Sequence, residues 1–116
     1  FNATSGSYLR TITNPNAYSS SAGDTFGYSM TMDGTTLVVG ARENEDGLGG
    51  SGKVYVFNVD TGALIHTIDN PNVFGTVESD EFGESVSVDG DKLIVGAARE
   101  DEATGTGSGK AYIFKI

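Results

Sequence analysis

The sequence predicts an all-β fold made of two repeated, four-stranded antiparallel units. The first observation is an internal repeat: residues 24–41 recur as residues 80–97, so that Phe26 and Phe82 lie 56 positions apart. The second is that both copies consist of short apolar or alternating runs bounded by turn residues, without a long run of helical period. The third is composition, with 17 Gly and 2 Pro among 116 residues, which is typical of turn-rich β structure. Repeats of this kind bury their apolar faces by stacking on one another.

The chain starts within a unit, because residues 1–16 align with residues 57–72. A tight turn at Thr4-Ser5-Gly6 precedes an apolar-rich run that predicts a strand at residues 8–12. Asn-Pro-Asn at 14–16 ends that strand, since Pro donates no ladder hydrogen bond. We therefore assign residues 1–16 as the outer strand of a unit plus a turn.

Residues 17–72 contain the first complete unit. Phe26-Gly27 opens an alternating strand, and Asp33-Gly34 between two strands predicts a tight hairpin of type I′. The run 37–41 is almost wholly apolar, as expected for a strand that is covered on both faces. Two further strands complete the unit, at residues 53–57 and 64–68.

Residues 73–116 repeat the series as far as the third strand, at residues 110–114. Four short antiparallel strands form one blade of a β-propeller, so this second blade lacks its fourth strand while the strand at residues 8–12 has no blade of its own. Pairing the two would satisfy both open edges. We predict a circularly permuted arrangement in which the N-terminal strand completes a blade of its own chain or of a neighbouring chain. The residues of this assembly strand are Tyr8, Leu9, Arg10, Thr11 and Ile12.

These patterns resemble the FG-GAP repeats of integrin-alpha-type β-propellers, in a bacterial or phage-like version. The likeness rests on Phe-Gly at the start of each unit, on the apolar runs ending in Gly-Ala at 37–41 and 93–97, and on the third strands. The resemblance implies a ring of blades used for adhesion, ligand binding or scaffolding. Propellers close with about four to eight blades. Two units would therefore need partner copies, or further repeats of a longer chain, to form a ring or a filament.

Calcium is the one cofactor that the resemblance brings into question. Family repeats often carry a calcium loop between the first two strands, but the turns at Asp33-Gly34 and Asp89-Gly90 are too short to supply the roughly six to eight oxygen ligands that calcium prefers. Two acidic loops beside Gly-rich turns are the remaining candidates, with Glu43, Asn44, Glu45, Glu100, Asp101 and Glu102 as ligands. The alternative for these loops is a solvated surface with internal Arg–Glu pairing.

No catalytic residue is expected. The chain has no Cys, and its one His, His66, takes the place that Arg10 holds in the other copy, which indicates an exposed polar position on an outer strand. No Ser or Thr has a His or Cys partner to activate it, and the carboxylates are spread over turns. The chain is therefore predicted not to be an enzyme.

Recurring aromatic residues predict a core between blades rather than a sugar-stacking surface, because they occupy the same strand positions in both copies. They are Phe26, Tyr55, Phe57, Phe82, Tyr112 and Phe114. Tyr18 and Phe74 lie in or near the poorly matched connections, so they are the surface candidates for a glycan or protein ligand.

The formal charge of −9 disfavours nucleic acid and anionic membranes as partners, and no apolar run reaches the roughly 20 residues that span a bilayer. We predict a non-enzymatic structural or adhesive repeat module that self-assembles head to tail as a homo-oligomer or filament. Its expected location is extracellular, on a cell surface, a secreted fibre or a virion. The alternative function is a carbohydrate-binding, lectin-like propeller.

Overall fold

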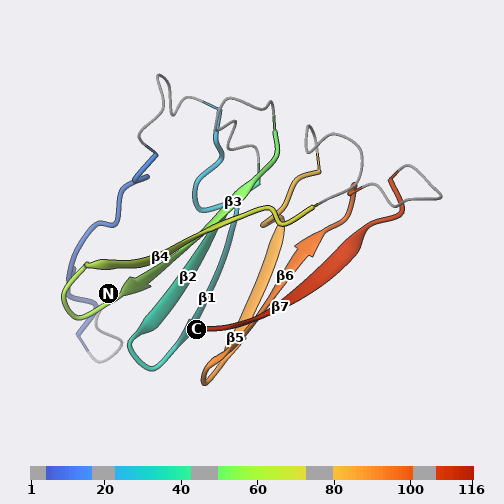
Figure 1. Cartoon of the computed structure of the whole chain (residues 1–116). Coiled ribbons are helices and arrows are strands. Elements are labelled where there is room, and N and C mark those ends of the chain that lie inside the picture. Colours follow the sequence, from blue (N-terminus) through green and yellow to red (C-terminus); the bar gives the residue numbers. More distant parts are fainter. Residues whose placement is uncertain (1–4, 17–22, 43–49, 73–79, 101–106) are drawn as a thin grey trace.

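The computed structural model describes residues 5–16, 23–42, 50–72, 80–100 and 107–116. Within these ranges the chain forms seven strands in two antiparallel sheets (Figure 1). The first sheet has the order β1-β2-β3-β4, with β1 (Ser29–Asp33), β2 (Thr36–Ala41), β3 (Lys53–Asn58) and β4 (Leu64–Asp69). The second has the order β5-β6-β7, with β5 (Ser85–Asp89), β6 (Lys92–Ala97) and β7 (Lys110–Lys115). The all-β, blade-like prediction is confirmed, with two sheets that do not close into a ring. None of the described residues forms a helix capable of crossing a membrane.

The hairpins between β1 and β2 and between β5 and β6 have a different turn type from the one predicted. Asp33 pairs with Thr36, so the loop residues are Gly34 and Thr35, and the second hairpin has the same register. Gly34 and its repeat equivalent Gly90 both have a φ of 57°, whereas Thr35 does not have a positive φ. A single Gly at the first central position is the pattern of a type II′ turn. The type I′ prediction was wrong because Asp33 belongs to the strand and not to the loop.

The strand predicted at residues 8–12 does not form within the chain. Residues 5–16, blue in Figure 1, belong to neither sheet and lie against β1–β4 on the side away from β5–β7. A strand needs a free sheet edge for its ladder hydrogen bonds, and the free edge of β7 (red) lies at the other end of the molecule. The prediction that this segment completes the second sheet of its own chain was therefore wrong. Completion of a neighbouring chain's sheet stays a prediction.

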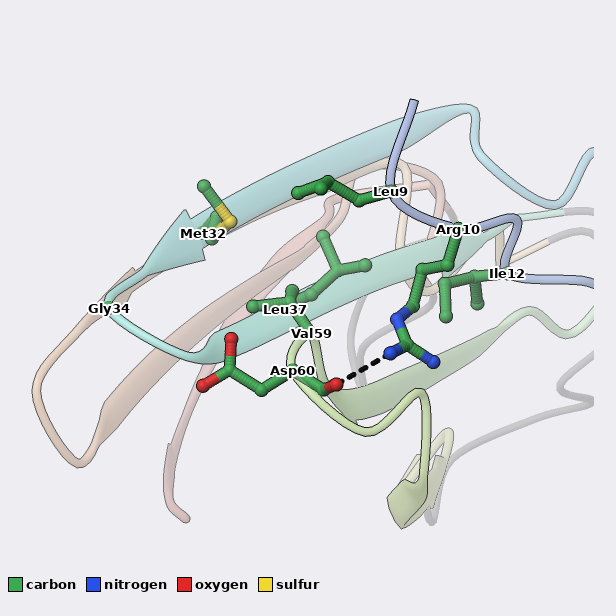
Figure 2. A pocket seen from close by; sticks show the side chains of 8 residues that line it. All are labelled: Leu9, Arg10, Ile12, Met32, Gly34, Leu37, Val59 and Asp60. Carbon is green, nitrogen blue, oxygen red and sulfur yellow. Dashed lines mark hydrogen bonds between the residues drawn. The ribbon is translucent and has the colours of Figure 1, made fainter. Parts of the chain in front are cut away.

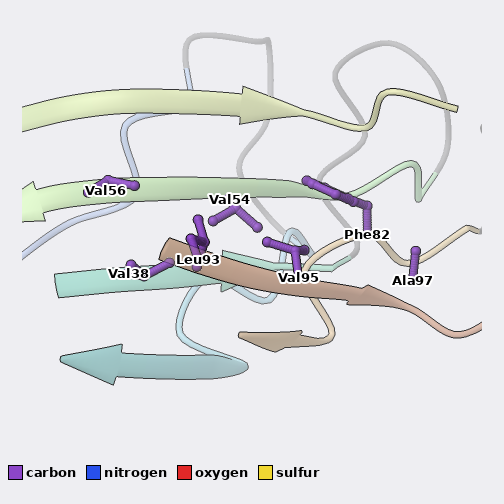
Figure 3. Packing of buried hydrophobic residues seen from close by; sticks show 7 residues of the cluster. All are labelled: Val38, Val54, Val56, Phe82, Leu93, Val95 and Ala97. Carbon is purple, nitrogen blue, oxygen red and sulfur yellow. The ribbon is translucent and has the colours of Figure 1, made fainter. Parts of the chain in front are cut away.

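Alternating apolar residues of both sheets build the core between them (Figure 3). The buried members are Val38, Val54 and Val56 from the first sheet, Leu93, Val95 and Ala97 from the second, and Phe82 from the segment before β5. Fully burying an aliphatic or aromatic side chain contributes about 1.5–3 kcal/mol. Packing between the two sheets is therefore a main source of the stability of this fold.

The inner strands of the two sheets come into direct contact, with β5 lying against β1 and β2. An ideal Cβ placed on Gly40 would lie 2.1 Å from the carbonyl oxygen of Gly83, so this close approach requires Gly. Ser29 Oγ donates a hydrogen bond of 2.6 Å to the same carbonyl. Further out, a cavity of about 150 Å³ lies between β4 and the β5–β6 hairpin. The two sheets thus pack tightly at their inner strands and less tightly further out.

Candidate functional site

Each sheet has one face that does not contact the other sheet, and these two faces form the candidate site. The face of the first sheet is partly covered, since Val39, Tyr55 and Phe57 on it are at most 3% exposed and Ile12 of the N-terminal segment packs on them. Strand alternation puts every second side chain on the same face of a sheet. The face of β1–β4 that points away from β5–β7 is here called the head face, and its defining residues are Phe26, Met30, Met32, Leu37, Tyr55 and Phe57. The face of β5–β7 that points away from β1–β4 is called the tail face, and its defining residues are Ser85, Ser87, Ile94, Ala111 and Ile113.

The first strand of each sheet shows that the two repeats bury opposite faces. In β1, Met30 and Met32 are 65% and 63% exposed, whereas Ser29 and Thr31 are partly buried on the side of the second sheet. In β5 the pattern is reversed, since the two valines are partly buried and the serines are exposed. The first repeat therefore uses its hydroxyl face for the contact between sheets, and the second uses its apolar face.

The tail face carries exposed apolar side chains at positions that are buried elsewhere in the molecule. Ile94 and Ile113 are 48% and 73% exposed. Their equivalents one repeat earlier, Val38 and Val56, are 0% and 1% exposed between the sheets. Adjacent exposed apolar residues on one sheet face are typical of a docking surface.

The head face is centred on an aromatic triad. The ring of Phe26 lies 5.8 Å from Tyr55 and 6.2 Å from Phe57, measured between centroids, and Phe82 makes the same triad one repeat later. Phe82 is completely buried, whereas Phe26 is only partly buried. The predicted core between blades is confirmed for the Phe82 triad, which lies between the two sheets, whereas the Phe26 triad forms a separate core cluster on the head face.

A cavity of about 310 Å³ lies between the N-terminal segment and the head face (Figure 2). Its lining residues are Leu9, Arg10, Ile12, Met32, Gly34, Leu37, Val59 and Asp60. Arg10 Nη2 donates a hydrogen bond of 2.6 Å to the backbone carbonyl of Asp60, which fixes the N-terminal segment over β1–β4. The cavity is lined mainly by apolar side chains, so it can accept a further apolar side chain.

Two buried carboxylates fix the connections that lead into β1 and β5. Asp24 Oδ2 accepts hydrogen bonds from the side-chain amides of Asn14 and Asn16, at 2.8 and 2.6 Å. Asp80 is held in the same way by the second Asn-Pro-Asn, at 2.8 Å for both bonds. Sequence reasoning treated Asn-Pro-Asn only as a strand terminator and missed this role. The signal was an Asp eight residues after the second Asn in both copies.

Glu81 joins the two repeats electrostatically. Its carboxylate oxygens lie 3.0 Å from Arg42 Nη1 and 3.3 Å from Arg99 Nη1. Arg42 precedes the second repeat and also lies over the ring of Tyr28, with its guanidinium carbon 4.1 Å from the ring centroid. These pairs join each acidic loop's Arg to Glu81, outside the loops. The internal Arg–Glu pairing considered for the loops stays a prediction, because residues 43–46 and 101–102 lie outside the described residues.

Of the six candidate calcium ligands, the structure describes only Glu100. Its side chain is completely buried, and Oε1 accepts a hydrogen bond from Tyr112 and lies 3.2 Å from Lys110 Nζ. Residues 43–45 and 101–102 lie outside the described residues. Among the described residues, no group of three or more His, Cys, Asp or Glu side chains is placed to hold a metal ion. Calcium binding stays a prediction, which is contradicted if the melting temperature is the same in millimolar calcium and in chelator.

The other candidates from the sequence fall in two groups. Tyr18 and Phe74 lie outside the described residues, so their role as ligand contacts stays a prediction. His66 is exposed on β4 and lines the cavity of about 150 Å³ with Val56 and Ile116. Thr36 and Asp91 line the same cavity.

Both repeats match a known family of sequences. The sequence model of a family described as FG-GAP repeat matches residues 16–57 and 75–114. Each matched range ends in the third strand of its sheet, within β3 and β7. A search of curated proteins found no significant match.

Proposed function

Because the chain belongs to the FG-GAP repeat family, we propose that it is a non-enzymatic structural or adhesive repeat module that assembles head to tail. Its location outside the cell, on a cell surface, a secreted fibre or a virion, is part of the proposal, since an adhesive module meets its partners there.

One observation carries the proposal: Ile94 and Ile113 are exposed at positions where the other repeat buries Val38 and Val56. Burying apolar surface stabilises an interface by about 25 cal/mol per Å² before the costs of association. A sheet that presents such residues gains from a second sheet. Head and tail are different surfaces, so the contact is heterologous and each chain can bind two neighbours.

The experiment is a measurement of native mass by light scattering over a range of protein concentrations, with circular dichroism to confirm β structure. We expect a mass above that of one chain, rising with concentration for a filament or reaching a plateau for a ring. A folded protein that keeps the mass of a single chain at all concentrations would overturn the proposal of self-assembly.

The lectin-like alternative is tested separately, because it depends on other residues. Glycan binding on an array, lost in variants of Tyr18 or Phe74, would favour a carbohydrate-binding module. Assembly without any glycan preference would favour the structural one.

A further inference from the structure

We infer that the β5–β7 sheet of one copy docks on the head face of a second copy, and that residues 8–12 of the second copy then form the fourth strand of that sheet. This inference rests on the proposed function and names its interface. The contact between β1–β4 and β5–β7 inside the chain serves as the template. If each residue of that contact is replaced by its equivalent in the other repeat, the same geometry places the tail face of one copy on the head face of the other.

The first step is the apolar packing. In the template, Val38 and Val56 of the first sheet bury Leu93 and Val95 of the second. The equivalents of the first pair are Ile94 and Ile113 on the tail face, both exposed. The equivalents of the second pair are Leu37 and Val39 on the head face, in the cluster with Tyr55 and Phe57. Leu37 is partly exposed, whereas Val39 is only 1% exposed in the single chain, so a docked sheet would have to replace part of its present cover. Both halves of the template are therefore present at the two ends of the chain, and each is apolar.

The second step concerns the position of Phe82 against the residues that precede β3. In the template, the backbone N–H of Phe82 donates to the carbonyl of Ser51, at 3.2 Å, and the absence of a side chain on Gly52 makes room for the Phe82 backbone. The equivalents of Ser51 and Gly52 in the second repeat are Ser108 and Gly109. An ideal Cβ on Gly109 would lie 2.8 Å from the carbonyl oxygen of Ala98 of the same chain, so the backbone of Ala98 already takes up part of this space. Phe26 of a second copy, which is only partly buried in the single chain, would lie beside it.

The third step is the close approach of the inner strands. Gly40 lies under the Gly83 carbonyl of the neighbouring sheet, but the three atoms nearest to an ideal Cβ on Gly96 all belong to Ser85. Gly96 is the repeat equivalent of Gly40 and leaves room for Gly27 of a second copy. Ser85 would then donate to the Gly27 carbonyl, as Ser29 donates to that of Gly83.

The fourth step compares the two cavities. The cavity of about 150 Å³ in the template is lined by Ile65 and His66 of β4, by the β5–β6 turn, and by Thr36 and Val56 of the first sheet. The cavity at the head is lined by the equivalents of the first two groups, Leu9 and Arg10 and the β1–β2 turn, and is larger, about 310 Å³. Thr36 and Val56 of the first cavity have no counterpart in the head cavity, because their repeat equivalents would have to come from a preceding sheet. In the proposed assembly these are Lys92 and Ile113 of the copy whose β5–β7 sheet docks on the head face.

The fifth step concerns the N-terminal segment. Ile12 packs on the head cluster as its equivalent Ile68 of β4 packs on the core between the sheets. Residues 8–12 thus already lie where the fourth strand of a preceding sheet belongs, although no sheet edge is present for them to pair with. The free edge of β7 from a docked copy supplies those hydrogen bonds.

Two single variants test the interface. Ile113→Asp places a charge on the tail face and Met32→Asp places one on the head face, and both side chains are more than half exposed, so the single chain should keep its fold. We expect each variant to have the mass of one chain by light scattering, with unchanged circular dichroism. Ile65→Asp makes the same type of change at a 49% exposed residue outside both faces, and it should assemble like the wild type.

Mixing the two variants gives the decisive result. The Met32→Asp protein keeps an intact tail and the Ile113→Asp protein keeps an intact head, so an equimolar mixture should form a dimer with one copy of each. In the wild-type assembly, hydrogen exchange should show protection of the backbone amides of residues 8–12 and of β7.

The outcomes separate the two proposals. A wild-type protein that stays monomeric overturns both self-assembly and this interface. Wild-type assembly that survives Ile113→Asp and Met32→Asp leaves self-assembly standing and overturns the interface. Two monomeric variants that do not combine, or an assembly in which residues 8–12 gain no protection, also overturn it.

Discussion

At the scale of single residues, Phe26 and Phe82 occupy equivalent positions in the two repeats but differ in burial. Phe82 is completely buried between two sheets, whereas Phe26 is partly buried and, among the described residues, packs with its own sheet and Ile12 of the N-terminal segment. The sequence treats them alike, and the difference comes from the neighbour. Burial at such a position therefore measures whether the adjoining sheet is present.

Replacing each Phe by Ala should have unequal effects on the stability of the single chain. We expect Phe82→Ala to lower the free energy of unfolding by about 3–5 kcal/mol, the usual cost for a buried Phe, and Phe26→Ala to cost less. Urea unfolding of an assembly-deficient variant measures both changes in the monomer. Equal losses of unfolding free energy for the two substitutions would contradict the interpretation that Phe26 is fully buried only when a neighbouring sheet is present.

The pair Asp91 and Lys92 gives a prediction about pH. Lys92 Nζ donates a hydrogen bond of 2.6 Å to Asp91 Oδ1, and this bond lowers the pKa of Asp91 below its ordinary value. A carboxyl group whose pKa is lowered in the folded state stabilises the fold at pH values above its ordinary, unfolded-state pKa. That contribution is lost as the pH falls through the folded-state pKa. Both side chains are about half exposed, so solvent screening keeps the effect on stability small.

The measurement for this pair is an NMR titration. Lys92→Ala should raise the pKa of Asp91 toward its ordinary value and should leave the acid unfolding midpoint of the single chain unchanged. An unshifted pKa in the variant would show that the hydrogen bond is not the cause.

At the scale of elements, the hairpins are fixed by one residue each. Gly34 has a φ of 57°, with no other atom within 4 Å of an ideal Cβ, so an Ala side chain there would be strained by the backbone alone. We expect Gly34→Ala to destabilise the chain by about 1–2 kcal/mol. Thr35→Ala, at the other loop position, should change the unfolding free energy by less than about 0.5 kcal/mol. Thermal or urea unfolding compares the two, and similar losses would contradict the type II′ assignment.

The strands themselves show how far a sequence pattern reaches. Periodicity and turn residues predicted all seven strands that the structure describes. Five agree to within one residue at each end, whereas β1 and β5 begin three residues after the Phe at which they were predicted to open. The eighth, at residues 8–12, was predicted from the same kind of pattern and does not form in the single chain. Apolar alternation records which side chains suit a sheet, but the ladder of hydrogen bonds depends on an edge that another element must supply.

At the scale of the whole molecule, the ion pairs between repeats offer a gain-of-function test. Arg42 pairs with Glu81 inside the chain at 3.0 Å. One repeat along, Arg99 stands in the place of Arg42, and Thr25 stands in the place of Glu81 with a similar φ, 54° against 57°. The proposed head-to-tail contact would therefore lack a pair that the internal contact has.

We expect Thr25→Glu to strengthen assembly through a pair with Arg99 of the next copy. An ion pair at a partly exposed site contributes about 0.2–1 kcal/mol, which corresponds to at most about a fivefold gain in affinity and is weakened by salt. Analytical ultracentrifugation at low and high salt measures the change. Adding Arg99→Ala to the variant should remove the gain. A gain that survives Arg99→Ala would contradict this geometry.

The candidate site was only partly accessible from the sequence. The pattern pointed to residues 8–12 as an assembly element, but it did not single out Ile94 and Ile113, because the run 93–97 was interpreted as a strand covered on both faces. In the structure Leu93 and Val95 are buried and Ile94 is half exposed. The apolar alternation on both faces was the signal, and its meaning depended on which face had a neighbour.

The sequence by itself determined the two repeats, their strands, their aromatic triads and the family. These are properties of local periodicity and of residue spacing, and each repeat encodes them on its own. Only the tertiary structure decided the turn type, the partners of Asp24 and Asp80, the absence of a strand at residues 8–12, and the face that each sheet buries. The physical reason is that burial and ladder pairing belong to contacts between elements far apart in the chain. Two similar repeats therefore use opposite faces for the contact between their sheets.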